Sequence, residues 1–595
     1  MPEITKAELD EVVAGQTIVG RFLETVAAHP DQVALRSKQA DESYGEWTYA
    51  TYAARVASAA AHLRSLGVGP GDRVVLMMRN IPEFHFIDLG VAALGATSIS
   101  IYNSSSPEQV AYLVGHCHAA VAVVEDDSFE DRFTQVRDQL PALRTIVNLS
   151  RDGVRAELLE GAGLDLDAEV ANSTPETLAT VIYTSGTTGP PKGVMLTHYN
   201  VVWTSEGYLR LLEVEPVGFR AISYLPMAHI AERMSTHYLA VMGGYEVTTC
   251  PDPGQLAAYA RDVHPQIMFG VPRVWEKLYA GVQAALGADP AKKAKFDEAV
   301  AAAIPIVERR TMGEASAEDD ATYAFLDEVA FAVVRGLVGL DQLEYAVSGA
   351  APIPAELISW YRAIGVPLSE IYGMSESTGP MTWEPLRVKA GTVGVAFPGT
   401  VVFLADDGEV CTRGGNVFQG YLDDPEKTAE ALDADGTLHS GDIGLFDDEG
   451  YLRIVDRKKE LIITAGGKNI SPANLEAALK TIPLVAQACA IGDNRPFVSA
   501  LVVLDAEVAP VWAKEQGLEF ASLADLAVHP TMVAEVDKGL AECMAGFNNA
   551  ERVKKVKILS AEWLPDTEEL TPTSKLKRRG VHARYAEEIE SLYAQ

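Results

Sequence analysis

The sequence predicts an α/β protein organised around a mostly parallel, doubly wound sheet. Within residues 15–150, segments with helical spacing alternate with short buried-strand patterns. The helix-like segments are 51–68 and 84–96, and the strand-like segments are 72–80 and 120–126. Strands that alternate with helices are typical of βαβ units, in which neighbouring strands run parallel. The 48% of apolar residues suffices for large buried cores and excludes a disordered chain.

Two later regions depart from this alternation. Residues 275–340 are rich in Ala, Lys, Glu and Asp and poor in strand formers, so we expect a helical insertion with a weak middle at Gly313–Asp320. Residues 392–456 combine Gly, Val and Asp with short apolar runs, which favours a small β region.

A smaller α+β unit is expected from Lys458 onward. A strand-like run ends at Asp456, a charged segment follows, and LIITAGGKNI comes after it. We therefore predict an N-terminal domain over 1–456, a C-terminal domain over 457–595, and a hinge at about 456–459.

The charge balance narrows the function classes. The chain has 49 basic and 83 acidic residues, a formal net charge of −34. This charge argues against a general nucleic-acid binder and against adhesion to anionic membranes through overall charge.

Cysteine usage and apolar patterning indicate the compartment. The five cysteines are odd in number and form no Cys-x-x-Cys pair, which fits free thiols in a reducing compartment. The acidic N-terminus shows no signal-peptide pattern, and no apolar stretch reaches the about 20 residues that span a bilayer. We expect a cytoplasmic protein without a transmembrane segment.

The strongest chemical signal is the run YTSGTTGPPKG at 183–193. A strand-like segment, 178–184, leads into it. Its glycines permit tight turns, its hydroxyls and amides can surround phosphate oxygens, and Lys192 adds a positive charge. By composition alone, an ordinary turn between a strand and a helix fits equally well. A Walker A loop does not fit, because Pro191 precedes the lysine and Gly193 follows it.

Further motifs occur in a fixed order after this loop. With the loop they are YTSGTTGPPKGVMLTH (183–198), YLPMAHIAER (224–233), SGAAPI (348–353), YGMSES (372–377), SGDIG (440–444), DRKKELIITAGGKNISP (456–472) and TPTSKLKRR (571–579). Together they resemble the adenylate-forming superfamily of acyl-CoA synthetases, adenylation domains and luciferases, over roughly residues 15–590. GVPRVWEKLY (270–279), the helical insertion and LPMAHIAER are most similar to bacterial long-chain fatty acid–CoA ligases.

The resemblance implies a more detailed fold. A large N-terminal AMP-binding domain would contain two doubly wound α/β subdomains, a distorted β-barrel-like subdomain and the acyl-binding pocket. A small, mobile α+β domain would follow it.

The resemblance also implies a reaction in two halves. ATP and a carboxylate give an acyl adenylate and pyrophosphate, and the thiol of CoA then displaces AMP. Positioning and charge neutralisation would carry the catalysis, without a protein nucleophile. In agreement, the sequence has no G-x-S-x-G or HExxH motif. The implied cofactors are ATP, Mg²⁺ and CoA as co-substrate.

Roles for the nucleotide follow from matching motif positions. Thr184, Ser185, Gly186, Thr187, Thr188 and Lys192 match the phosphate loop. Gly349, Ala350 and Ala351 would line adenine, Tyr372 with Gly373 would lie against the base, and Ser375 would add a polar contact near the phosphates. Glu376, with Thr184, would hold magnesium. Asp442 would accept from both ribose hydroxyls, and Arg457 would contact the ribose.

The remaining matches concern the acyl group and the small domain. Lys575 would bridge the carboxylate and the α-phosphate, although its charge run with Lys577 and Arg578 also fits a solvated face. Lys459 takes the hinge position, and Gly466 and Gly467 would line the path of the CoA pantetheine. His229 would lie near the acyl carboxylate. Arg233 stands where some relatives have a gate tryptophan. The implied catalytic set consists of Lys575, Lys192, Glu376 and Thr184.

Three readings follow for function. The first is a ligase for medium- to long-chain fatty acids, with fatty acid, ATP and CoA as partners. The second is an acyl-AMP ligase that loads an external carrier protein, and the third is a non-catalytic homologue that binds nucleotide or lipid. Nucleic acid is not an expected partner, whereas transient membrane contact and a homodimer are compatible with the sequence.

Overall fold

The computed structural model describes residues 4–184, 190–212, 214–463, 469–549, 551–564, 567–571 and 575–594. The chain forms two compact units. The first comprises Met1–Ala350, Glu356–Phe403 and Cys411–Ser440, and the second comprises Ala351–Ala355, Leu404–Val410 and Gly441–Gln595.

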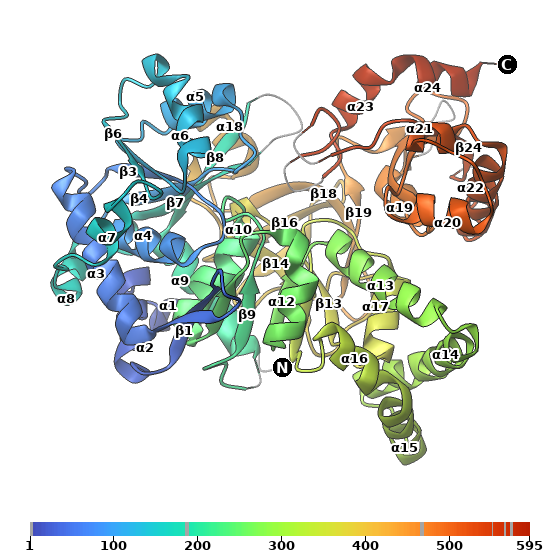
Figure 1. Ribbon diagram of the computed structural model, residues 1–595, viewed down its shortest axis with the longest axis horizontal. Coiled ribbons are helices and arrows are strands. Elements are labelled where there is room, and N and C mark those ends of the chain that lie inside the picture. Colours follow the sequence, from blue (N-terminus) through green and yellow to red (C-terminus); the bar gives the residue numbers. More distant parts are fainter. Residues whose placement is uncertain are drawn as a thin grey trace. The chain divides into compact units, whose positions relative to one another are not determined.

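A seven-stranded sheet of order β17-β8-β7-β4-β3-β5-β6 lies in the first unit (Figure 1). Its strands are β3 (Arg73–Met77), β4 (Thr97–Ser100), β5 (Val121–Val124), β6 (Thr145–Asn148), β7 (Leu178–Thr184), β8 (Lys192–Thr197) and β17 (Gly420–Tyr421). The strands from β7 to β6 pair in parallel, whereas β8 is antiparallel to both of its neighbours.

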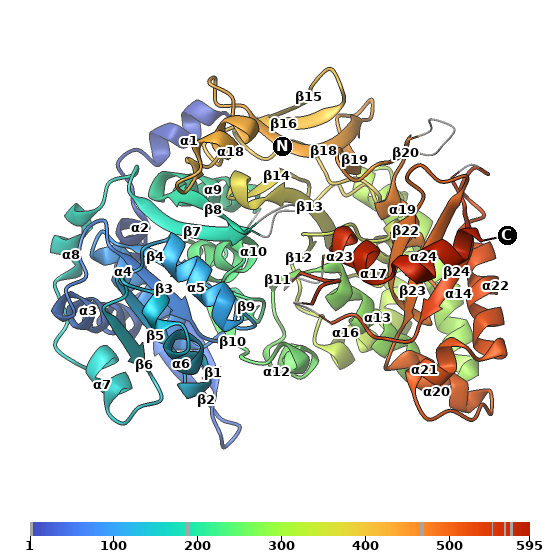
Figure 2. The same ribbon diagram turned by 90° about the horizontal axis from the view of Figure 1, so that it is seen from above.

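Alternate residues of the central strand enter different cores. Val74 and Leu76 pack in one core with α3 (Tyr49–Ser65) and α4 (Pro82–Ala93), while Val75 and Met77 pack in the other. The second core also contains residues of α5 (Pro107–His116) and α6 (Asp127–Thr134). Figure 2 shows these helix pairs on opposite faces of the sheet. Because both faces of the strand are covered, this is the doubly wound sheet that the sequence predicts.

The first unit also contains two four-stranded sheets. Their orders are β2-β1-β10-β9 and β11-β12-β13-β14. The strands are β1 (Val33–Lys38), β2 (Tyr44–Thr48), β9 (Arg220–Ser223), β10 (Glu246–Thr249), β11 (Ile267–Gly270), β12 (Tyr345–Ser348), β13 (Leu368–Met374) and β14 (Gly379–Trp383). β11, β12 and β13 pair in parallel, so their carboxyl ends share one edge, where ligands of α/β proteins commonly bind.

Helices fill most of residues 272–338. They are α13 (Pro272–Gly287), α14 (Pro290–Met312), α15 (Ala317–Leu326), the π-helical turn η5 (Asp327–Phe331) and α16 (Ala332–Val338). Gly313 has a φ of +76° and ends α14, within the stretch expected to be weak.

The other helices before residue 440 are short to medium in length. They are α1 (Lys6–Val12), α2 (Ile18–Ala28), η1 (Arg137–Gln139), α7 (Val154–Leu159), α8 (Leu166–Glu169), η2 (Val170–Asn172), α9 (His198–Leu211), α10 (Ile230–Glu232), the π-helical η3 (Arg233–Tyr238), α11 (Leu239–Gly243), η4 (Pro253–Gln255), α12 (Leu256–Val263), α17 (Ala355–Ala363), η6 (Ser375–Ser377) and α18 (Pro425–Ala431).

A small β region precedes the C-terminal part of the chain. Its four-stranded sheet has the order β15-β16-β18-β19, with β15 (Val401–Leu404), β16 (Glu409–Arg413), β18 (Leu438–Phe446) and β19 (Leu452–Arg457). These strands span 401–457 and so coincide, to within one residue at the end, with the region 392–456 where the sequence favours β structure.

The C-terminal part has its own sheet of order β22-β23-β24. Its elements are β20 (Ile462–Ile463), β21 (Asn469–Ile470), α19 (Pro472–Leu479), β22 (Val485–Ile491), β23 (Val498–Leu504), α20 (Val508–Glu515), α21 (Leu523–Ala527), α22 (Pro530–Cys543), β24 (Val553–Leu559), α23 (Arg578–Arg584) and α24 (Ala586–Tyr593). Val502 packs in one core with residues of α19 and α22, and Leu501 packs in another with residues of α23 and α24. The sheet is therefore covered on both faces by helices, and this part of the chain is the smaller unit of mixed α and β structure that the sequence predicts.

The last residue of the segment LPMAHIAER (225–233) takes part in a buried ion pair. The Arg233 guanidinium donates to Asp88 and to the hydroxyl of Tyr238, and all three side chains are buried. His237 Nε2 lies 2.8 Å from the second oxygen of Asp88. Arg233 occupies the position of a gate tryptophan in some relatives, but here it is fixed in an internal charge network.

Glu232, the neighbouring residue, holds the start of the same segment. Its carboxylate accepts from the backbone N–H groups of Tyr224 and Leu225 at 3.1 and 3.2 Å, and from Thr236 at 2.6 Å. The amide of Asn80 donates to it at 3.3 Å. Burial raises the pKa of Glu232 to about 7, against the effect of these donors, which lower it.

We predict that Glu232→Gln changes how stability depends on pH. The folded carboxyl keeps its proton up to about pH 7, whereas the unfolded one loses it near its ordinary pKa of 4.5. Wild-type stability should therefore fall as pH rises through this window, by up to about 1.4 kcal/mol per pH unit. The variant lacks this term, so its Tm relative to wild type should rise from about pH 5 to about pH 7. A difference in Tm that is constant with pH, as expected for the exposed control Glu215→Gln, would contradict the assignment.

Candidate functional site

Strand pairing brings the phosphate-loop lysine to a buried glutamate. β7 and β8 form a hairpin in which Thr184 pairs with Lys192. On its other side β8 pairs with β17, where Tyr421 lies opposite Val194. As a result Lys192 Nζ lies 4.1 Å from the centre of the Tyr421 ring. The Tyr421 hydroxyl donates to Glu376 Oε1 at 2.7 Å.

These three side chains form a half-buried charge cluster. Glu376 is 5% exposed, and burial lowers the pKa of Lys192 while the charge of Glu376 opposes that shift. Burial, together with Glu376, raises the pKa of the Tyr421 hydroxyl well above its usual range, so the hydroxyl stays protonated and can donate. A cation and an anion on either side of a neutral donor suit a phosphate group with its metal ion.

The carboxyl edge of the parallel strands carries the residues expected around adenine. Gly349 directly follows β12, and a Cβ there would lie 2.7 Å from Ile371 Cγ2, so the site favours glycine. Ala350 has a φ of +70°, an uncommon conformation for a residue with a side chain. Tyr372 lies on β13, and Ser375 and Glu376 lie on the short helix η6 directly after it.

In the second unit, strand pairing joins the two residues expected at the ribose. Asp442 on β18 lies opposite Arg457 on β19, and Arg457 Nε is 3.4 Å from Asp442 Oδ1. Asp442 is 9% exposed. The N–H of Gly441, whose φ is +75°, donates to Glu409 at 2.9 Å. This carboxylate also pairs with Lys458, within the predicted hinge at 456–459.

The basic run near the C-terminus divides into structural and exposed residues. The Arg578 guanidinium donates to both carboxylate oxygens of Glu476, at 2.5 and 2.7 Å. Lys577 donates to the Thr567 carbonyl at 2.8 Å. Lys575 is exposed, and its backbone N–H donates to the Thr571 hydroxyl at 2.9 Å. The run is therefore only partly a solvated face, since Arg578 ties it to α19.

His229 begins the helix α10 in the segment LPMAHIAER. Its Nδ1 accepts from the Ala231 N–H at 3.1 Å, so the ring serves as the helix cap. Lys459 lies in the turn that follows β19.

Several predicted site residues lie outside the described residues. They are Ser185, Gly186, Thr187, Thr188, Gly466 and Gly467. Of the others, the structure brings together Lys192 with Glu376, Gly349 with the β13 segment, and Asp442 with Arg457. Tyr421 was missed by sequence reasoning, because its role depends on strand pairing and no local pattern marks it.

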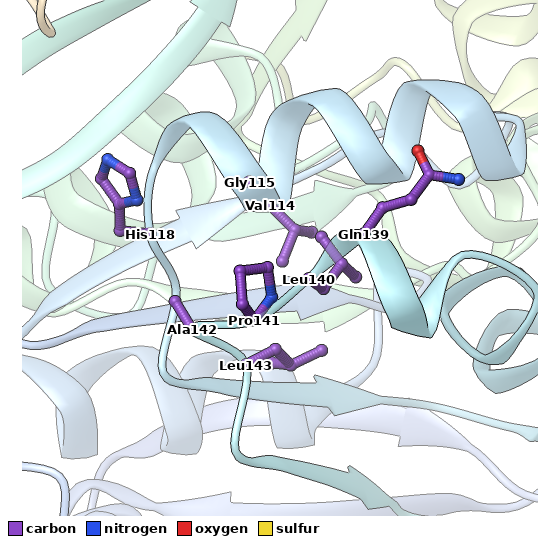
Figure 3. A pocket seen from close by; sticks show the side chains of 8 residues that line it. All are labelled: Val114, Gly115, His118, Gln139, Leu140, Pro141, Ala142 and Leu143. Carbon is purple, nitrogen blue, oxygen red and sulfur yellow. The ribbon is translucent and has the colours of Figure 1, made fainter.

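A small hollow elsewhere on the first unit contains none of the predicted residues. It has a volume of about 200 Å³ and lies at the end of α5 (Figure 3). Its lining is Val114, Gly115, His118, Gln139, Leu140, Pro141, Ala142 and Leu143. With His118 and Gln139 as its polar side chains, this lining has no charged partner for a phosphate.

The described ranges contain neither a metal-ligand cluster nor a membrane-spanning helix. No set of three or more His, Cys, Asp and Glu side chains within them could hold a metal ion. Nor does any helix in the described part of the chain have the length and apolar character needed to cross a membrane.

Comparisons with known proteins identify the family of the chain. The sequence model of the AMP-binding enzyme family matches residues 22–422, and that of the AMP-binding enzyme C-terminal domain matches 459–595. Long-chain-fatty-acid–CoA ligase FadD15 of Mycobacterium bovis is 36% identical over 95% of both chains. Long-chain-fatty-acid–CoA ligase ACSBG2 of Xenopus laevis is 34% identical over 97% of this chain and 84% of its own.

A solved structure supports the fold. The A domain of carboxylic acid reductase from Segniliparus rugosus, in complex with AMP and a co-purified carboxylic acid, superimposes with a TM-score of 0.75. It is 20% identical and covers 100% of this chain and 96% of its own. The sequence matches confirm the resemblance that the seven motifs indicate. The chain belongs to the AMP-binding, adenylate-forming enzyme family, among its long-chain fatty-acid–CoA ligases.

Proposed function

We propose that this chain activates a medium- to long-chain fatty acid. ATP and the carboxylate would give acyl-AMP and pyrophosphate, and the CoA thiol would then give acyl-CoA and AMP. The observation that carries the proposal is the cluster of Lys192, Tyr421 and Glu376 beside the phosphate-loop hairpin. Ligases with related sequences are named for the same substrates. None of the five cysteines, all of which the structure describes, forms a disulfide, which supports a reducing compartment, and we propose the cytoplasm.

In the first half-reaction a carboxylate oxygen attacks the α-phosphorus and pyrophosphate leaves. Lys192 would neutralise charge on the phosphates, and Tyr421 would orient the Glu376 carboxylate through its hydrogen bond. Glu376 and Thr184 would hold Mg²⁺ together with phosphate oxygens, as is usual where one carboxylate and a nucleotide share this ion. When bound, the ion would supply further neutralisation of phosphate charge. Asp442 and Arg457 would orient the ribose.

The two half-reactions would use different parts of the small domain. Lys575 lies about 116 residues beyond the hinge position Lys459, whereas Gly466 and Gly467 follow it closely. Lys575 in one half-reaction, and Gly466 with Gly467 in the other, would have to reach the same nucleotide. We therefore propose that the domain after the hinge at 456–459 rotates between adenylation and thioester formation.

The proposed function is tested with a panel of fatty acids, C4 to C20, supplied with ATP, magnesium and CoA. AMP, pyrophosphate and acyl-CoA should form in equal amounts, with the longer chains preferred. Stoichiometric ADP would contradict attack at the α-phosphorus. Acyl-AMP that accumulates without thioester would favour an external carrier protein as acceptor, and no turnover with any acid would favour a non-catalytic role.

Lys192→Ala should lower pyrophosphate formation about 10- to 100-fold, because one charge-assisted contact to phosphate is worth about 1.5–3 kcal/mol. Lys427→Ala is the matched control. The Lys427 ammonium is close enough to lower the pKa of Lys192, yet it pairs with Glu430 at 2.7 Å. Initial rates of pyrophosphate release measure both. A loss below twofold in Lys192→Ala, or an equal loss in both variants, would remove Lys192 from the phosphate site.

Glu376→Gln should raise the magnesium concentration needed for half-maximal adenylation, because a hard cation loses a carboxylate ligand. Tyr421→Phe should shift it less, since the ring beneath Lys192 remains and only the hydroxyl bond to Glu376 is lost. Magnesium titrations of adenylation measure these shifts, with Glu430→Gln as a nearby acidic control. An unchanged magnesium dependence in Glu376→Gln would exclude Glu376 from the metal site.

Lys575→Ala and Lys459→Pro should impair different half-reactions. The first should abolish acyl-AMP formation yet convert supplied acyl-AMP and CoA to thioester. The second fixes φ near −65° at the hinge and should impair thioester formation while adenylation persists. Arg579→Ala and Lys459→Ala are the controls. Both half-reactions are measured separately, and an equal loss of both in each variant would contradict domain alternation.

A further inference from the structure

An exposed apolar stripe runs along the outer face of the helical insertion. Phe325, Val329, Val333 and Leu337 are 61%, 56%, 61% and 67% exposed. They are spaced four residues apart from the end of α15, through η5, to the end of α16. Figure 1 shows α15 at the far end of the excursion formed by α14 to α16, away from β13.

The π-helical turn keeps these side chains on one face. In an α-helix, residues four apart lie about 40° further around the axis, so three such steps would rotate the stripe by about 120°. A π-helix has more residues in each turn, and η5 (Asp327–Phe331) lies in the middle of the stripe. Its wider turn offsets part of the rotation, which aligns the two ends.

Charge is almost absent from this face. Between Ala321 and Leu337 the other exposed residues are Ala321, Thr322, Ala324, Glu328, Ala332 and Gly336, so one charge interrupts five turns. The nearby arginines are neutralised by ion pairs. These pairs are Arg309–Asp319, Arg310–Asp320 and Arg335–Asp327.

The opposite face of the same helices is anchored in the protein. Phe331 and Val334 are buried, and the ring of Phe331 lies 5.8 Å from that of Phe296. Arg335 also donates to the carbonyl of Ile364 at 2.6 Å. The helix is therefore apolar on both sides while only one side has a packing partner, a pattern that marks an interaction surface.

We propose that the face from Phe325 to Leu337 docks on a lipid surface with neutral headgroups. Taking about 150–250 Å² for a whole aromatic side chain and less for aliphatic ones, the four side chains expose on the order of 400 Å². A stable protein interface needs about 800 Å² on each partner, of which these side chains would supply about half, and this favours a bilayer over a second copy. A crossing helix would also meet only part of the stripe, whereas a bilayer covers its whole length.

The net charge of the protein and the pairing of its nearby arginines indicate which headgroup charge the lipid surface would carry. The chain has a net charge of −34, and the arginines beside the stripe are paired, so anionic headgroups would not attract it. The relation to catalysis rests on the proposed function, because long-chain fatty acids dissolve in bilayers. The contact itself does not depend on that function and is measured without ATP or CoA.

The test is co-sedimentation of the full chain with phosphatidylcholine vesicles. Val329→Asp should lower the partition coefficient about tenfold or more, because it removes one apolar side chain from the lipid contact and introduces a charge there. Val511→Asp is the matched control, since Val511 on α20 has the same 56% exposure. Phe325→Ser with Leu337→Ser serves as a second variant, and circular dichroism verifies that each variant folds.

Selective loss of vesicle binding in Val329→Asp and in the double variant supports the proposal. Equal binding by wild type and Val329→Asp overturns it. A dimer in sedimentation velocity that Val329→Asp dissociates, without vesicle binding by wild type, also overturns it and identifies a second copy as the occupant. Turnover of a short, water-soluble fatty acid should be unchanged in Val329→Asp, so failure of docking is distinct from failure of the ligase assignment.

Discussion

The antiparallel position of β8 between β7 and β17 is the constraint on which the candidate site depends. The hairpin with β7 holds Lys192 opposite Thr184 at the two ends of the phosphate loop. The pairing with β17 places Tyr421 beneath the lysine and within 2.7 Å of Glu376. Backbone hydrogen bonds therefore join residues from three distant segments, and the side chains need no large loop movement to meet.

Further ionisable groups are buried in the first unit, where ion pairs and hydrogen bonds hold them in place. Asp88 and Arg233 form a buried pair, and Glu232 accepts from backbone donors at the start of the segment that carries His229. An isolated buried charge would destabilise the fold, so each of these groups must stay beside its partner. The backbone segments that carry the partners are thereby held together. Burial therefore raises the pKa of Glu232, whereas at Asp88 the charge of Arg233 together with His237 outweighs burial and holds the pKa of that carboxyl below its usual range.

The outer helices show the opposite arrangement. The insertion exposes apolar side chains where a water-facing helix would normally carry charge, and a π-helical turn keeps them on one face. A few charged groups are thus buried with partners, while one uncharged face is turned toward solvent. The candidate site would orient a nucleotide, and the proposed outer surface would contact the medium in which fatty acids dissolve.

Local patterns in the sequence determined the alternation of strands and helices, the β and α+β character of the later regions and, through the order of seven motifs, the family. Through the resemblance to that family, the motifs also predicted Lys192, Glu376, Asp442 and Arg457 as nucleotide-site residues. Only the tertiary structure decided that Tyr421 joins Lys192 to Glu376, that Arg233 is a buried ion-pair partner, and that Arg578 anchors the basic run through Glu476. Each of these contacts joins residues between 45 and 229 positions apart (421 − 192 = 229), and periodicity reports only neighbours within a few turns.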